Sequence, residues 1–333
     1  MRVLVTGGAG YVGSALVPKL LDQGHEVRVL DLYLFGESSL ESVRGRAGFL
    51  EFRGDIRDGD LLGRALSGCE AVIHLACVSN DPSVDLDPAL AQSVNYDCMR
   101  PLVRSCKKSG VRRFIFASSS SLYGVCGTSE VTEETPHRPV TLYNRLKSLC
   151  ESVLWEEQSS DFHPVSIRPA TICGYSPRMR LDLVVNILTN QAFHRRRITV
   201  LGGQQLRPNI HIEDMTDLYA MLLKAPERSI AGQAFNAGFA NHTVVELAEI
   251  VRREVSAKLS RPDITVEVQP SDDIRSYRIS SEKLKKLLGF TPRRTVEQAV
   301  REMIDAFAAG KVPNAMEDAR YYNARHLVQA SLV

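Results

Sequence analysis

The sequence predicts an α/β fold, in which helices cover both faces of a parallel β-sheet. Three observations lead to this prediction. Apolar strand-like runs alternate with helical patterns along roughly the first half of the chain. A glycine-rich loop follows the first of these strands directly, and the second strand ends in an acidic residue. The alternation breaks beyond Pro169, which indicates a second and smaller lobe.

The first elements together form a dinucleotide-binding fingerprint. The apolar strand 2–6 is followed at once by the glycine loop 7–13 and by a helical pattern over 12–20, and a second strand, 26–30, ends in Asp31. Glycines in such a loop permit a tight turn and let backbone amides approach a pyrophosphate, while the helix N-terminus attracts the anion. This context favours a doubly wound Rossmann sheet, although a glycine-rich turn without a ligand has the same local pattern.

Asp31 determines which dinucleotide we expect. Its carboxylate can accept hydrogen bonds from both hydroxyls of the adenosine ribose, and it would repel the 2′-phosphate of NADP. Leu32 follows it and offers no compensating cation. The sequence therefore predicts NAD as the cofactor.

The elements that follow keep the alternation to about residue 173. The expected order is strand 49–52, helix 61–66, strand 71–75, helix 88–108, strand 113–117, a helix around Tyr143 and strand 165–167. Later elements are helix 182–194, strand 198–200, helix 214–224, strand 234–237 and helices 244–259 and 295–309. We expect a NAD-binding domain at 1–173 plus about 208–238, and a smaller C-terminal α/β substrate-binding lobe at about 174–207 plus 239–333.

Tyr143 and Lys147 lie four residues apart on a segment whose apolar residues recur at helical spacing. Side chains at this spacing share a helix face. The lysine cation is therefore expected to lower the pKa of the phenol and favour the phenolate that a general base needs. The serine run 118–121 closes the strand 113–117, at the sheet edge where ligands of parallel sheets bind.

Composition excludes several other classes of function. The 333 residues carry a net charge of +2 with both signs mixed along the chain, which gives no reason to expect nucleic acid or an acidic membrane surface. No apolar run reaches the roughly 18 residues of a membrane span. The seven cysteines are scattered without a Cys-x-x-Cys pair, which argues against a metal site and favours reduced thiols in a cytoplasmic protein.

With these motifs, nearly the whole chain resembles the extended short-chain dehydrogenase/reductase family, in particular its nucleotide-sugar epimerases and dehydratases. The resemblance implies a catalytic set of Ser119, Tyr143 and Lys147. The cofactor contacts that it implies are Gly7, Gly10, Tyr11, Val12, Gly13, Asp31, Asp55, Ile56, Leu75, Ala76, Asn95, Tyr143, Lys147 and Pro169. The substrate contacts that it implies are Ser120, Thr171, Arg207 and Arg275.

The chemistry implied by this resemblance is hydride transfer on a nucleotide-diphosphate sugar. Tyr143, as a phenolate, would remove the proton of a sugar hydroxyl while the hydride on the same carbon passes to the nicotinamide of NAD. Ser119 would hydrogen-bond the same oxygen, and Lys147 would also bind the nicotinamide ribose. The expected activity is epimerisation at C4 through a transient 4-keto sugar, with NAD regenerated in every cycle.

Two alternatives remain, a nucleotide-sugar 4-ketoreductase that releases its dinucleotide and a non-catalytic NAD-binding sensor. The intact Ser119, Tyr143 and Lys147 argue against the sensor. A dehydratase is disfavoured because dehydratases of this family place an Asp-Glu pair where Ser120 and Ser121 stand, and serine does not ionise usefully at neutral pH.

Several polar residues have more than one interpretation. Cys77 and Cys173 could lie near the pocket, yet buried cysteines are mostly inert. Arg178 and Arg180 could bind phosphate or be solvated charges, and the run 80–83 could meet the ligands or form an ordinary turn.

The two arginines expected at the substrate diphosphate have an alternative as well. Arg207 and Arg275 could instead be surface side chains paired with Asp272 or Glu213. Planar guanidinium groups bind phosphate oxygens in bidentate fashion, which favours the diphosphate interpretation of both arginines.

We also expect a homodimer that forms a four-helix bundle from two helices per subunit, near 88–108 and 140–159. An apolar stripe at Leu90, Val94, Leu102 and Cys106 would supply the contact, and the family resemblance implies the same arrangement. The same stripe could also be ordinary core.

Overall fold

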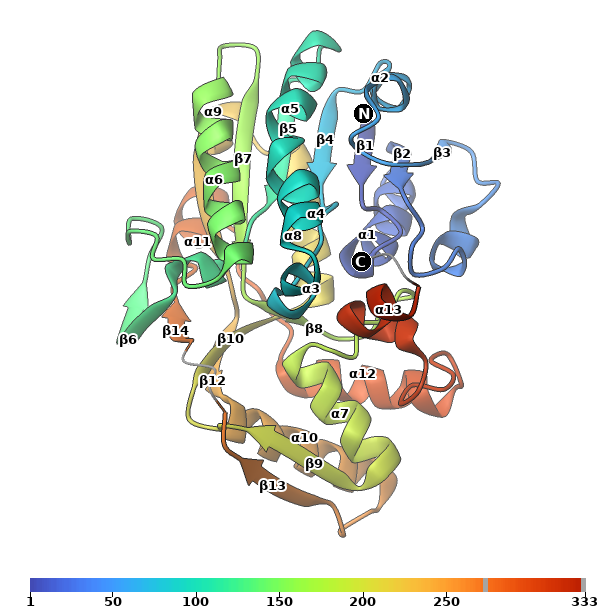
Figure 1. Ribbon diagram of the computed structural model, residues 1–333, viewed down its shortest axis with the longest axis vertical. Coiled ribbons are helices and arrows are strands. Elements are labelled where there is room, and N and C mark those ends of the chain that lie inside the picture. Colours follow the sequence, from blue (N-terminus) through green and yellow to red (C-terminus); the bar gives the residue numbers. More distant parts are fainter. Residues whose placement is uncertain (272–274, 331–333) are drawn as a thin grey trace.

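The computed structural model describes residues 1–271 and 275–330, which form a large sheet with helices on both faces and a smaller lobe beyond the carboxyl ends of its strands (Figure 1). The sheet has the strand order β11-β7-β5-β4-β1-β2-β3, and every neighbouring pair is parallel. Its strands are β1 (Arg2–Thr6), β2 (Glu26–Asp31), β3 (Phe49–Arg53), β4 (Ala71–His74), β5 (Arg113–Ala117), β7 (His163–Pro169) and β11 (Gln233–Ala237). The predicted fold class is confirmed.

The central strands are apolar on both faces because each face packs against helices. In β1, Val3 and Val5 belong to one core cluster and Leu4 to the other, and all three are fully buried. The first cluster includes residues of α1 (Tyr11–Asp22) and α8 (Ile212–Lys224). The second includes residues of α2 (Gly59–Leu66), α5 (Met99–Lys108) and α6 (Leu142–Glu157). Continuous apolar strands are typical of parallel sheets covered in this way.

The smaller lobe has a core of its own. It is built from α7 (Val184–Arg195), β9 (Arg197–Leu201), α10 (Val244–Leu259), β13 (Thr265–Gln269) and α12 (Val296–Ala308). A three-stranded sheet of β8 (Thr171–Cys173), β10 (Leu206–His211) and β12 (Ala240–Thr243) lies between this lobe and the main sheet (Figure 1).

One segment that the sequence assigned to the smaller lobe packs elsewhere. Tyr277, Leu284 and Phe290 are buried in a core cluster of the main sheet. They belong to β14 (Ser276–Ile279), to α11 (Glu282–Leu288) and to the loop after it, and β14 pairs with β6 (Val125–Val131). The chain therefore returns to the larger domain a second time.

The helix expected over 88–108 is not continuous. It consists of α4 (Pro88–Gln92), a π-helical segment Ser93–Asp97 and α5. Pro101 explains the break, because it has no N–H to donate to the carbonyl of Asp97 and its ring would clash with that carbonyl. The backbone reaches α5 through the wider turn instead.

The stripe expected to form a dimer contact is largely core. Leu102 and Cys106 are 1% and 0% exposed and pack between α5 and the main sheet. Val94 is partly buried against the same cluster, and Leu90 faces the cavity described below. These residues supply no apolar face beyond what covering the sheet requires, so this basis for the dimer was wrong.

A buried ion pair fixes α6 on the sheet. The Glu151 carboxylate accepts hydrogen bonds from Arg168 (2.6 and 3.1 Å) and from the hydroxyl of Ser166 (2.7 Å), both on β7. The side chains of Glu151 and Arg168 are 1% and 5% exposed. Burial opposes ionisation of Glu151, but the hydrogen bonds and charge of Arg168 outweigh it and hold the pKa of the carboxyl below its usual value. Arg168 thus faces the helix and not the cofactor cavity.

Glu151→Gln should destabilise the protein, because it leaves the Arg168 cation buried without its carboxylate. The free energy of unfolding in urea should fall by about 3–5 kcal/mol. The folded-state pKa of Glu151 is depressed, so its contribution is present above the unfolded value of about 4.3 and is lost as the pH falls through the folded value. Glu249→Gln, in an exposed pair with Arg252, is the control and should cost about 1 kcal/mol or less. Equal costs for the two variants would contradict this role.

In the described part of the chain, none of the helices is long and apolar enough to cross a membrane.

Candidate active site

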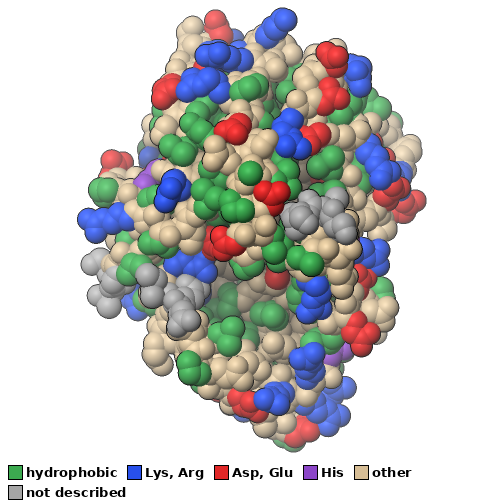
Figure 2. All heavy atoms as spheres, viewed as in Figure 1, with side chains coloured by type: hydrophobic (Ala, Val, Ile, Leu, Met, Phe, Trp, Pro, Cys, Tyr) green, Lys and Arg blue, Asp and Glu red, His purple; other side chains and the backbone are tan. Residues whose placement is uncertain are grey.

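A cavity of about 1060 Å³ lies between the two lobes. It opens beyond the carboxyl ends of β1 and β4, the neighbouring strands at which the strand order reverses. Ligands of doubly wound sheets bind at this position. A recess between the lobes, partly lined by apolar side chains, is visible in Figure 2.

The glycine loop is shaped by close backbone approaches. Gly7 has φ +72°, and a Cβ there would lie 2.6 Å from the backbone nitrogen of Ala76. A Cβ at Gly13 would lie 2.5 Å from Cα of Gly8. Gly7 lines the cavity, whereas Gly13 lets α1 pack on the loop and does not line it. The loop therefore leaves its backbone open to a ligand, as a pyrophosphate requires.

Three further residues of the loop face the cavity, and one of them also contacts the smaller lobe. Gly10, Tyr11 and Val12 line the cavity. The Tyr11 hydroxyl donates to the carbonyl of Gly174 (2.7 Å), so this side chain ties the start of α1 to the smaller lobe. Its contact with a cofactor is therefore limited to the atoms that face the cavity.

Asp31 joins β2 to the glycine loop. Its carboxylate accepts the amide of Ala9 at 2.9 Å and that of Tyr33 at 2.7 Å. Burial raises the pKa of Asp31, while these two hydrogen bonds act in the opposite direction. Arg178, from a loop of the smaller lobe, is close enough to act on the same carboxylate. Arg178 was considered a possible phosphate ligand, but its position near Asp31 was not predicted because the two residues lie far apart in the chain.

The remaining cofactor residues lie where parallel strands end. Residues that line the cavity are Asp55, Ile56, Leu75, Ala76 and Pro169, and the substrate candidate Thr171 joins them. Asn95 does not line it. Its side chain donates to the carbonyl of Val78 (2.9 Å) and accepts the amide of the same residue (2.8 Å). Asn95 therefore holds the backbone after β4, which in turn forms part of the wall.

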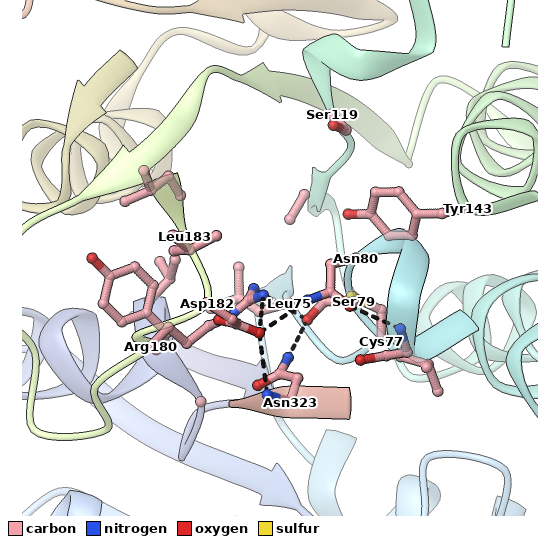
Figure 3. A pocket seen from close by; sticks show the side chains of 18 of the residues that line it. Leu75, Cys77, Ser79, Asn80, Ser119, Tyr143, Arg180, Asp182, Leu183 and Asn323 are labelled. Carbon is pink, nitrogen blue, oxygen red and sulfur yellow. Dashed lines mark hydrogen bonds and ion pairs between the residues drawn. The ribbon is translucent and has the colours of Figure 1, made fainter. Parts of the chain in front are cut away.

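The three predicted catalytic residues come together at one wall of the cavity. Ser119 follows β5, and Tyr143 and Lys147 lie on α6. The side chains of Ser119 and Tyr143 face the cavity (Figure 3). Lys147 Nζ donates to the carbonyl of Ala117 (2.7 Å) and lies 5.8 Å from the centroid of the Tyr143 ring. Tyr143 and Lys147 therefore lie side by side on α6, as their spacing predicts, and Ser119 lies at the same wall.

Burial, and not the Lys147 cation, has the largest effect on the pKa of Tyr143. Burial raises the pKa of Tyr143 well above 10, and the principal cation that opposes this is Arg180. Arg180 is not a solvated charge, since its side chain is 12% exposed and binds Asp182 (2.9 Å). It also donates to the hydroxyl of Ser79 (3.3 Å) (Figure 3). The position of Arg180 depends on how the smaller lobe packs, and the spacing of residues along a helix does not predict that packing.

The serine run is held rigidly by its own hydrogen bonds. The Ser119 hydroxyl oxygen accepts the amide of Ser121 (3.2 Å), and the two hydroxyl oxygens lie 2.7 Å apart. The Ser121 hydroxyl donates to the side chain of Asn144, which is fully buried beside Tyr143. Ser120 lines the cavity and its hydroxyl lies 3.4 Å from that of Tyr277. Ser119 therefore meets a ligand in a fixed orientation.

The two arginines expected at the substrate diphosphate lie together at the cavity wall. The Arg207 guanidinium donates to the backbone carbonyl of Arg275, and Arg275 forms an ion pair with Asp81. One alternative partner, Glu213, forms an ion pair with Lys19 (2.8 Å). The other alternative partner, Asp272, lies outside the described residues. Both arginines line the cavity.

The run 80–83 is more than an ordinary turn. Asn80 has φ +72°, caps α3 (Asp81–Leu86) by accepting the amide of Ser83 (3.0 Å), and donates to Asp182 (2.9 Å). A non-glycine residue at positive φ is uncommon and tends to occur at functional sites. Asp182 and Asn323 were missed from the sequence as site residues, whereas Asn80 was considered only as part of the run 80–83. Asn and Pro at a helix start signal only the cap of α3.

Neither cysteine near the site shows a chemical role. Cys173 is buried, and burial raises the pKa of its thiol to about 12. Cys77 lines the cavity. All seven cysteines, which lie in the described part of the chain, are free thiols. Within residues 1–271 and 275–330, no cluster of His, Cys, Asp or Glu side chains could hold a metal ion.

Comparison with known proteins places this geometry in a known family. The profile of the NAD dependent epimerase/dehydratase family matches residues 3–238. A UDP-glucose 4-epimerase of Mycolicibacterium smegmatis is 30% identical over 319 residues, covering 92% of this chain and 98% of the relative. The Thermus thermophilus UDP-glucose 4-epimerase, solved with NAD, has a TM-score of 0.80 at 27% identity and covers 92% of this chain and 99% of that one. A dTDP-glucose 4,6-dehydratase of Streptomyces venezuelae has a TM-score of 0.84 at 22% identity, with 96% and 100% covered, and shows likeness of fold alone.

NAD should bind at least ~10-fold more tightly than NADP, because the Asp31 carboxylate would repel a 2′-phosphate. Titration calorimetry with both dinucleotides measures this. Asp31→Asn removes the charge and keeps the shape of the side chain. It should reduce the ratio of the two affinities, because NAD binds more weakly and NADP more tightly. Equal or tighter binding of NADP to the unaltered protein would overturn the assignment of Asp31.

Proposed function

Because the chain belongs to the NAD dependent epimerase/dehydratase family, we propose that it is a nucleotide-sugar epimerase that inverts C4 through a transient 4-keto sugar. Family membership confirms the expected enzyme class, of extended short-chain dehydrogenase/reductase type, and the expected cofactor, NAD. The curated relatives include UDP-glucose 4-epimerases, which supports the same reaction for this chain.

The observation that carries the proposal is the composition of one cavity wall. Ser119, Tyr143 and Lys147 provide a hydroxyl, a phenol and a cation at the carboxyl end of the sheet. The two positions after Ser119 are Ser120 and Ser121, which offer neither an acid nor a base for elimination of water. These side chains can therefore transfer one proton to and from a substrate hydroxyl and hydrogen-bond its oxygen. Those are the tasks of a reversible oxidation at a single carbon.

The cavity also suits the cofactor. The open backbone at Gly7, the acid at Asp31 and the end of β4 fit a dinucleotide that crosses the switch between β1 and β4. NAD, when bound, supplies the acceptor and donor of the hydride. Lys147 lies beside Tyr143 on the same wall, where it would bind the nicotinamide ribose.

The side chains then perform the acid-base work. Tyr143 removes the proton from the C4 hydroxyl and later returns it, which is why its protonation must change during the cycle. Burial favours the neutral phenol, so cations that act on the ring are needed to make the phenolate accessible. Lys147, 5.8 Å from the ring centroid, and Arg180 provide them. Ser119 hydrogen-bonds the same substrate oxygen and keeps it in place as it becomes a carbonyl.

Tyr143→Phe should lower the rate of epimerisation by at least ~10²-fold, the usual contribution of a general base. The rate is measured by NMR on UDP-, GDP- and dTDP-hexoses. The amount of NAD released from the denatured protein should stay unchanged, and Tyr175→Phe, outside the cavity, should keep full activity. Near-normal turnover by the Tyr143 variant would rule out its assignment as the base. An unaltered protein that purifies without NAD would favour the ketoreductase.

We propose that Arg207 and Arg275 hold the diphosphate of a nucleotide sugar. Each Arg→Ala variant should weaken nucleotide-sugar binding by ~1.5–3 kcal/mol, the scale of a charged hydrogen bond, while NAD affinity stays the same. Calorimetry with UDP-, GDP- and dTDP-sugars measures this and identifies the nucleotide. Arg278→Ala, an exposed arginine on the same strand as Tyr277, is the control. Unaltered binding in both variants would mean that the diphosphate is held elsewhere.

We further propose a homodimer through the outer faces of α5 and α6. These helices pack on one another, joined by Arg100 and Lys107 of α5 to Glu157 of α6. Leu149 is 38% exposed on α6, and apolar side chains are interspersed with charged ones on this side of the molecule (Figure 2). Light scattering at micromolar concentration should give twice the mass of the chain, and Leu149→Lys should reduce it to one. A monomer mass for the unaltered protein would refute the dimer.

We propose a cytoplasmic location for the protein. Seven free thiols within the described residues suit a reducing compartment. A nucleotide sugar and NAD are the ligands proposed above, and both would have to be available there.

A further inference from the structure

A segment near the end of the chain lies against the adenosine side of the cavity. It comprises the turn Ala319–Tyr321 and α13 (Asn323–Gln329), here called the α13 segment. Figure 1 shows α13 just beyond the carboxyl ends of β1 and β2, between the two lobes. His326 Nε2 donates to the carbonyl of Leu34 (2.6 Å), and its ring lies 5.1 Å from that of Phe35. Both partners belong to the loop that follows Asp31.

Asn323 joins three separate parts of the cavity wall. Its backbone amide donates to Asp182 (3.1 Å), and its side-chain amide donates to the hydroxyl of Ser79 (2.8 Å) (Figure 3). Its side-chain oxygen accepts the guanidinium of Arg178. Asn323 is 5% exposed, so these hydrogen bonds are made away from water. One asparagine thus couples α13 to the loop after β4 and to the loop 176–182.

Arg178 is the buried cation of this arrangement. Its side chain lines the cavity, is 5% exposed, and places its guanidinium 3.8 Å from the centroid of the Phe35 ring. Nε of Arg178 has no hydrogen-bond partner in the described part of the chain. A buried guanidinium with an unfilled donor is costly unless a ligand oxygen completes it. Burial and the neighbouring Arg180 lower the pKa of Arg178, which indicates that the protein alone compensates this charge poorly.

The surroundings show which ligand oxygen is available. Asp31, Tyr33, Phe35 and Leu327 line the cavity together with Arg178. Asp31 is the acid expected at the adenosine ribose, so the adenosine half of the dinucleotide would lie among these side chains. That half carries ribose hydroxyls and a phosphate, and both accept hydrogen bonds.

We propose that Arg178 and the α13 segment form a clamp on the adenosine half of NAD, an inference that uses the proposed function only for the identity of the cofactor. Arg178 donates to a phosphate or ribose oxygen of the dinucleotide. Asn323 holds the guanidinium in position, and His326 holds the loop of Phe35 on which it stacks. The clamp lies outside the glycine fingerprint and holds the dinucleotide on the protein.

The test measures cofactor retention in the full chain, independently of any sugar. Arg178→Gln, Asn323→Ala and His326→Ala are compared with Val328→Ala, which alters the exposed side of the same helix. NAD content is determined after gel filtration and denaturation, and the dissociation constants of NAD and ADP-ribose are measured by calorimetry on protein freed of cofactor. Thermal unfolding of the cofactor-free variants shows that each is folded.

Arg178→Gln and Asn323→Ala should each raise the dissociation constants of NAD and ADP-ribose by the same factor, at least ~10-fold. His326→Ala should also raise the two dissociation constants, and Val328→Ala should leave both constants unchanged. Wild-type retention by the folded Asn323 variant, or weaker NAD with unaltered ADP-ribose, would overturn the clamp. Absence of sugar epimerisation by the unaltered protein, with the cofactor affinities of the variants as expected above, would count against the proposed function alone, because these readouts involve no sugar.

Discussion

The ion pair between Glu151 and Arg168 determines where the catalytic helix lies. Glu151 is one helical turn beyond Lys147 and two beyond Tyr143, and its partner is on β7, between β11 and β5 of the main sheet. Because both charges are buried, the pair tolerates little displacement. The pair thereby fixes the position of α6 along the sheet and its rotation about the helix axis. The phenol of Tyr143 and the hydroxyl of Ser119 depend on that placement to face the same cavity.

A second constraint comes from the smaller lobe, which completes a site that the sheet alone leaves open. Arg180 brings a cation to the buried Tyr143, and Asp182 holds it there. The same carboxylate accepts Asn80 and the amide of Asn323, so the substrate side and the adenosine side share one hydrogen-bond network. Side chains of both lobes thus connect the proposed sugar site with the proposed clamp on the cofactor.

The sequence predicted those parts of the fold and site whose signals are local. The glycine loop, Asp31 and the pair Tyr143 and Lys147 could be identified because a turn, a strand end or one helix face fixes each of them. Arg180 and Asn323 could not, since their roles depend on contacts between segments far apart in the chain. The π-helical break before α5 was missed for a different reason: apolar periodicity continues through it, and only Pro101 signals the change of backbone.

The central claim is that the hydride removed from C4 returns to the same sugar within one site. The most direct measurement uses a nucleotide hexose labelled with deuterium at C4 and follows the label by NMR and mass spectrometry in both epimers. The account predicts that the product keeps its deuterium at C4, with NAD still bound to the protein and no label in water. Loss of the label to free NADH, or a keto product that accumulates with loss of water, would contradict it.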